Sequence, residues 1–216
     1  MKLNPINYRR GVTLMEVLAI IAVIVLVVAL LLPALANGRR RTSRIGCINN
    51  VKQVQLAFMT WSLDNSDRFP MQVSTTDGGS MEFVAGGHTF PHFQVISNEI
   101  STPKLLNCPV DNRMFAANFQ NDFTDSNISY FVGLDASSTN PASFLIGDSH
   151  FAIGGVPVKS GLLLLSTDTS VGWTSARHDG RGNIALADGS VHLVNSSELR
   201  KLTAETRLAT NRISIP

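Results

Sequence analysis

The strongest pattern along the chain is an apolar run near the N-terminus, with no charged residue from position 17 to position 36. An α-helix rises about 1.5 Å per residue, so a run of roughly 20 residues spans the hydrocarbon core of a bilayer. Glu16 stands at the edge of this run. Because an acidic residue at the centre of a membrane helix costs roughly 2.5–3.5 kcal/mol, this carboxylate predicts a binding partner.

The helical pattern continues beyond the apolar run as an amphipathic stripe. Apolar residues recur there at spacings of three and four, namely Ile45, Ile48, Val51, Val54, Phe58 and Trp61. This spacing places them on one face of a helix. We therefore expect one long helix from about residue 13 to about residue 63. Its first half is apolar all round, its second half packs on the rest of the chain, and a bend is expected near Pro33.

Shorter apolar runs later in the chain predict strands. Residues 143–146 and 161–165 form two of them. The clearest signal is a hairpin in which residues 183–187 and 190–194 flank Asp188-Gly189, a dipeptide typical of a two-residue turn with positive φ at both positions. The expected fold class is therefore α+β, with the long N-terminal helix packed on an antiparallel β-sheet.

Two further segments complete the expected organisation. Residues 71–103 are rich in Gly, Thr and Ser and are expected to form short strands and loops. A short helix is expected from about residue 198 to about residue 209, with Ser196 or Ser197 as its N-cap.

Composition limits the classes of function. With 216 residues, the chain has room for one soluble domain beside the membrane segment. A net charge of +2 and 16% charged residues give no electrostatic footprint for nucleic acid. Arginines and a lysine flank both ends of the apolar run (Lys2, Arg9, Arg10, Arg39, Arg40, Arg41 and Arg44), so charge asymmetry does not decide the orientation in a membrane.

The N-terminal residues resemble the type IV prepilin and pseudopilin signal. Arg9 and Arg10 precede Gly11, Glu16 follows five positions after that glycine, and Pro33 lies where the family often has a kinking proline. The resemblance implies cleavage between Gly11 and Val12 by a prepilin peptidase, which also methylates the new amine of Val12. The family usually has Phe at this first mature position.

The same resemblance implies a membrane location and partners. The leader stays in the cytoplasm, the helix is stored in the inner membrane, and the head lies outside the cytoplasm. Glu16 pairs with the N-terminal amine of a neighbouring pilin-like subunit during filament assembly. The expected partners are the peptidase, other pilin-like subunits and the lipid bilayer, with no nucleic acid.

A second motif extends the resemblance to the C-terminal part. His178 is followed by nine residues and then by Asp188-Gly189. This is similar to the prepilin-processing-associated domain named for its His-x9-Asp-Gly motif. The implied organisation is a leader at 1–11, a membrane or filament-core helix at 12–36, its amphipathic continuation at 37–66, and a β-rich pilin-like head at 67–216 with the hairpin at 178–194.

Other accounts of the apolar run remain open. A plain signal anchor explains its length but not Glu16. A secretory signal peptide would be cut after Ala36, although the run exceeds the usual apolar region of about 7–15 residues. A membrane-anchored envelope enzyme or ligand-binding protein would use the segment only for attachment. We expect a pilus-like or type II secretion pseudopilus subunit and no enzyme.

Cys47 and Cys108 are the only cysteines. Outside the cytoplasm an even pair can form a disulfide, which we expect here, whereas the alternative is two separate thiols.

His178 offers a second choice. It could belong to a metal or acid–base site with Asp148 and His150, or it could serve the hairpin through a hydrogen bond. We expect the structural role, and neither a metal, a cofactor nor a catalytic residue. His88 and His92 are expected in a loop, and residues 121–127 are expected to be a solvated loop rather than a calcium site.

Overall fold

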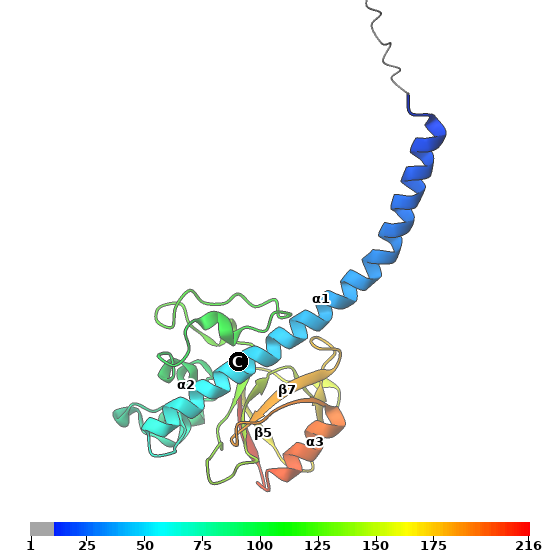
Figure 1. Ribbon diagram of the computed structural model, residues 1–216. Helices are drawn as coiled ribbons and strands as arrows, with labels where there is room; N and C mark the ends of the chain where they lie inside the picture. The colour runs from blue at the N-terminus through cyan, green and yellow to red at the C-terminus, as the bar shows by residue number, and fades with distance from the viewer. Residues whose placement is uncertain (1–10) are drawn as a thin grey trace, which may run out of the picture. The chain divides into compact units, whose positions relative to one another are not determined.

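The computed structural model describes residues 11–216, and within helix α1 the side chains of residues 33–41 lie outside this description. Helix α1 spans Leu14–Asp64. The chain divides into two compact units, one ending at Thr42 and the other formed by Ser43–Pro216. The first unit contains the apolar part of α1, and the second contains the rest of α1 and all other elements (Figure 1).

The second unit contains two antiparallel sheets. The larger has the strand order β5-β9-β1-β2-β7-β8 and the smaller the order β4-β3-β6. The strands are β1 (Tyr130–Gly133), β2 (Phe144–Asp148), β3 (Phe151–Ile153), β4 (Val156–Pro157), β5 (Gly161–Leu165), β6 (Val171–Trp173), β7 (Arg181–Leu186), β8 (Val191–Asn195) and β9 (Asn211–Ile215). Helix α3 (Ser196–Glu205) connects β8 to β9.

Residues 65–129, all of which the structure describes, form helical turns and loops without a strand. Their elements are the 3-10 helices η1 (Pro70–Gln72), η2 (Thr75–Asp77), η3 (Met81–Gly86), η4 (Pro103–Leu106) and η5 (Asp125–Asn127), and the helix α2 (Phe90–Val95). The prediction of short strands within residues 71–103 is therefore wrong. Proline occupies the first turn of η1, α2 and η4, where its fixed φ favours a helix start.

The central strands β1, β2 and β7 of the larger sheet are buried on both faces. Alternate residues of β1 separate the two cores, because Tyr130 and Val132 belong to one and Phe131 to the other. The first core also contains the inner face of α1, which lies beside the sheet in Figure 1. The second contains Leu199 of α3 and the aromatic pair Phe151 and Trp173 from the smaller sheet.

The inner face of α1 begins at a residue that the sequence analysis did not place there. Its central buried stripe consists of Cys47, Val51, Val54, Phe58 and Trp61, at alternating spacings of four and three. Ile45 is 53% exposed and Ile48 is only half-buried, so the buried stripe starts at the cysteine and not at Ile45. The predicted extent of the helix and its amphipathic second half are otherwise confirmed.

The predicted hairpin is present as β7 and β8, with Ile184 opposite His192. Its turn differs from the prediction. Only Gly189 has a positive φ, at 92°, and the Gly189 N–H donates to the Leu186 carbonyl. This is a longer connection with a single left-handed glycine instead of a two-residue turn. Helix α3 is also capped differently, because Asn195 is the N-cap.

Candidate functional site

The apolar part of α1 is exposed on every side within this chain. Residues Leu14–Leu32 have a mean hydropathy of 3.2, and none of that surface is buried. The helix is therefore long and apolar enough to cross a membrane. Such an apolar surface is stable only when lipid or another protein covers it.

Glu16 has a partner in its own chain. Its carboxylate accepts hydrogen bonds from the Thr13 backbone N–H at 3.1 Å and the Thr13 hydroxyl at 3.2 Å, while the Glu16 N–H donates to Thr13 Oγ1 at 3.3 Å. This is a capping box at the start of α1. Thr13 can therefore supply the partner that the Glu16 carboxylate requires. The expectation of a partner in another subunit did not take this local contact into account.

The other N-terminal residues singled out by sequence are placed only in part. Gly11 and Val12 precede the helix and are exposed. Residues 1–10, which include most of the predicted leader, lie outside the described residues. Pro33 lies within α1, but its side chain is outside the description, so the kink there stays a prediction.

The second compact unit contains a buried cluster of four potential metal ligands: Cys47, Cys108, Asp148 and His178. One ligand atom from each residue lies within 4.8 Å of all the others. The Cys108 Sγ is 3.2 Å from His178 Nε2, and the Cys47 Sγ is 3.6 Å from Asp148 Oδ1. His178 Nε2 is 3.8 Å from Asp148 Oδ2.

Each member of the cluster comes from a different part of the fold. Cys47 lies on the inner face of α1, and Cys108 follows η4. Asp148 ends β2, and His178 precedes β7. His178 has a φ of 54°, in the left-handed region that non-glycine residues seldom adopt. Such a backbone persists where surrounding contacts hold it, as at functional sites.

A surrounding layer of donors orients the cluster. The Asn183 backbone and side chain donate to Asp148 Oδ2 at 2.8 and 2.9 Å. The Tyr130 hydroxyl lies 3.4 Å from Cys47 Sγ. Asp148 is fully buried. Burying a carboxylate without partners is strongly unfavourable, so Asp148 requires these hydrogen bonds and a nearby cation.

The two thiols differ in acidity. The pKa of Cys108 is lowered to about 6, chiefly by its hydrogen bond with Cys47 and also by the one with His178, although burial opposes this. The same contact with Cys108, together with burial and the charge of Asp148, raises the pKa of Cys47. Burial alone would lower the pKa of His178, but Cys108 and Asp148 raise it overall.

The structure brings Cys47 and Cys108 together, as the expected disulfide requires, and it holds both as free cysteines. A disulfide in protein isolated from the envelope therefore stays a prediction. His178 does not bond across its hairpin as expected but contacts Cys108. Asp188 is exposed in the turn, where its carboxylate accepts the Ser190 N–H at 2.8 Å.

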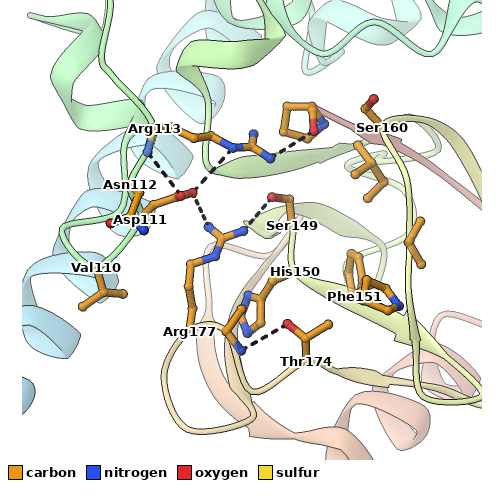
Figure 2. Close-up of a pocket in the computed structure, with 15 residues that line it drawn as sticks. Val110, Asp111, Asn112, Arg113, Ser149, His150, Phe151, Ser160, Thr174 and Arg177 are labelled. Atoms are coloured by element: carbon orange, nitrogen blue, oxygen red, sulfur yellow. Dashed lines mark hydrogen bonds and ion pairs between the residues drawn. The ribbon is translucent and has the colours of Figure 1, made fainter.

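A polar pocket of about 450 Å³ borders the loops that carry Cys108 and His178 (Figure 2). Arg177 Nη1 is 3.0 Å from Asp111 Oδ2, and Arg177 Nη2 donates to Ser149 Oγ at 3.0 Å. Arg113 lies on the other side of the same carboxylate, with its Nε 3.7 Å away. The pocket's charged groups thus bind one another, and the Asp111–Arg177 ion pair joins two loops of the cluster.

The remaining histidines have structural partners. His92 lies in α2, contrary to the predicted loop, and its Nδ1 is 2.7 Å from Ser80 Oγ. His88 lies 3.3 Å from Asp125, whose other oxygen accepts the backbone N–H groups of Thr89 and Phe90. Asp125 thus serves the start of α2. His150 Nε2 is 3.0 Å from the Arg181 carbonyl, outside the four-residue cluster.

Comparison of the chain with known protein families, with curated proteins and with solved structures gave no match.

All four cluster residues carry a signal in the sequence, but no pattern there joins them into one site. The expected disulfide paired the cysteines with each other, and the metal or acid–base alternative joined His178 to Asp148 and His150. One available signal was the position of Cys47, which shares the spacing of the buried stripe of α1. A cysteine on the inner face of that helix has to meet residues of the head.

Proposed function

We propose that this protein is a prepilin-like subunit. It is anchored by the apolar part of α1, processed between Gly11 and Val12, and assembled into a type IV pilus-like filament or a type II secretion pseudopilus. The observation that carries the proposal is the fully exposed apolar helix, Leu14–Leu32, with Glu16 in its first turn. An anchor requires the apolar surface but not the carboxylate.

The physical basis is an exchange of environment. In the membrane, lipid covers the helix, and in a filament other copies of the same helix cover it. Because lipid is as apolar as the helix surface, packing and polar pairing have to favour the assembled state. A carboxylate in the first turn can supply that pairing by meeting the N-terminal amine of another subunit, and a paired charge in an apolar core is far better than an unpaired one.

The capping box offers a competing role for Glu16, and one substitution separates the two. Glu16→Gln keeps the capping box, because glutamine also serves at this position, but removes the charge. Thr13→Ala is the matched control, since it removes the cap and keeps the charge. The measurement is co-sedimentation of each full-length variant with sheared filaments, with membrane retention measured in parallel.

The proposal expects Glu16→Gln to remain in the membrane but to be lost from filaments, while Thr13→Ala is incorporated. Normal incorporation of Glu16→Gln would show that the carboxylate serves only the helix end.

A second candidate is a membrane-anchored envelope protein that binds a ligand through its head. The specific observation in its favour is the buried cluster of Cys47, Cys108, Asp148 and His178. The same sedimentation experiment distinguishes it, because this candidate predicts wild-type protein in the membrane fraction alone.

A further inference from the structure

We propose that Cys47, Cys108, Asp148 and His178 bind one Zn²⁺ ion as a structural site that fastens the second half of α1 to the head. The ligand set contains two thiols, one imidazole and one carboxylate, which are the groups that zinc uses in proteins. The inference is independent of filament assembly, because it concerns only the second compact unit.

The spacing of the ligand atoms fits a tetrahedral ion. Zinc bonds of about 2.0–2.3 Å place neighbouring ligand atoms roughly 3.3–3.8 Å apart at the corners of a tetrahedron. Cys108 Sγ and His178 Nε2 are 3.2 Å apart. Asp148 lies 3.6 Å from Cys47 Sγ through Oδ1 and 3.8 Å from His178 Nε2 through Oδ2, and with one oxygen counted the four ligand atoms lie within 4.8 Å of one another. The cluster is therefore close to the size that one tetrahedral ion requires.

Burial indicates a structural site and not a catalytic one. Cys47, Cys108 and Asp148 are 0% exposed and His178 is 7% exposed. Four protein ligands complete the coordination of zinc, whereas a catalytic site keeps one position open for water or substrate. The polar pocket of Figure 2 is lined by neighbouring residues and by none of the four ligands.

The outer contacts resemble those of a metal site. Asn183 holds Asp148 through two hydrogen bonds to one oxygen, which leaves Oδ1 directed toward Cys47. Outer partners of this kind orient the ligands of metal ions. A zinc ion would hold both cysteines as thiolates and would balance their charge and that of Asp148 in this buried environment. The zinc site and a Cys47–Cys108 disulfide therefore exclude each other.

The site would have a mechanical consequence. Cys47 is the only ligand on α1, and the other three belong to the head. A bound ion would therefore connect the helix to η4, β2 and the loop before β7. Since metal binding to a folded site is also folding free energy, zinc should raise the thermal midpoint of the head.

The test uses the full-length protein in detergent, without a polyhistidine tag, reduced and stripped of metal with a chelator. Zinc per chain is measured after equilibration with ZnCl₂ and desalting, and Co²⁺ is added separately as a spectroscopic probe. We expect one ion per chain, a thiolate-to-cobalt charge-transfer band, and the intense visible bands of tetrahedral Co²⁺. Zinc should also protect both thiols from alkylation.

The variants are His178→Asn, which tolerates the left-handed backbone, and Cys108→Ser. The matched control is His150→Asn, a buried histidine beside the cluster. We expect the first two to lose the cobalt bands and the control to keep them. Asn183→Ala should weaken zinc binding by about 10–100-fold, as expected for an outer partner.

Three results would overturn the proposal. One is the absence of stoichiometric metal in reduced wild-type protein. Another is unchanged cobalt bands in His178→Asn. The third is a Cys47–Cys108 disulfide, without metal, in protein isolated directly from the envelope. If a variant fails to fold, alkylation of the wild-type thiols with and without zinc still decides the question.

Discussion

The Cys108 Sγ lies 3.2 Å from the Nε2 of His178, although the two residues are 70 positions apart in the chain. His178 makes this contact from a left-handed backbone, with a φ of 54°. The motif has two ends with different roles. His178 enters the buried cluster, and Asp188-Gly189 forms the hairpin turn that lies against α1.

The turn is attached to α1 by one buried side chain. Gln55 Nε2 donates to the carbonyls of Leu186 at 2.7 Å and Ser190 at 3.1 Å. Gln55→Leu should destabilise the head by about 1–3 kcal/mol, because it leaves both carbonyls without this donor. Gln53→Leu is the control, since the Gln53 side chain is exposed and bonds only within its own helix. Chemical denaturation of both variants checks the prediction, and equal stabilities would contradict it.

The Arg177–Asp111 ion pair beside the cluster should contribute more to the free energy of unfolding than a surface ion pair does. Arg177 and Asp111 are 8% and 15% exposed at their side chains. Arg177→Met leaves a mostly buried carboxylate with fewer donors, so we expect a loss of about 3 kcal/mol in unfolding free energy. Arg44 and Asp179 form an exposed pair, and Arg44→Met should cost no more than about 1 kcal/mol. Thermal and urea unfolding compare the two variants, and a similar small loss in both would refute the distinction.

Acid should destabilise the head through His92. Burial lowers the pKa of this fully buried side chain to about 4, from an ordinary value near 6.5. The unfolded chain therefore binds a proton at His92 more readily than the folded chain does. The contribution of His92 to the free energy of unfolding is complete above pH 6.5 and is lost as the pH falls toward 4. Its size is up to about 3 kcal/mol.

Urea titrations at several pH values test this contribution. His92→Asn should be less stable than wild type at neutral pH but should lose less stability between pH 6.5 and 4. His88→Gln is the control, because His88 is exposed. Parallel pH profiles for wild type and His92→Asn would rule out the proposed effect of His92.

Local sequence patterns were sufficient to predict α1 and the β7–β8 hairpin. The 3.6-residue repeat marks the second half of α1, and Asp188-Gly189 between two short apolar runs marks the hairpin. Composition is a poor guide for residues 71–103, where Gly, Ser and Thr are equally compatible with the helical turns that the structure has. The prolines at the starts of η1, α2 and η4 carried the correct local signal.

The cluster could not be predicted in the same way. Its four residues occupy a helix, a loop, a strand end and a strained turn, so no fixed spacing connects them. Only the packing of α1 on the sheet brings Cys47 to Asp148. The cap of α1, in contrast, can be predicted from the sequence, because Thr13-Leu14-Met15-Glu16 has the local pattern of a capping box. That pattern was not among the signals used above.

The central claim, that this chain is a processed prepilin-like subunit, is tested most directly by the mass of the mature N-terminus. The protein is isolated from membranes of cells that contain a prepilin peptidase, and its N-terminal peptide is sequenced by mass spectrometry. The account predicts a chain that begins at Val12 with a methylated amine. A chain that still begins at Met1 or that begins at Asn37 would contradict it.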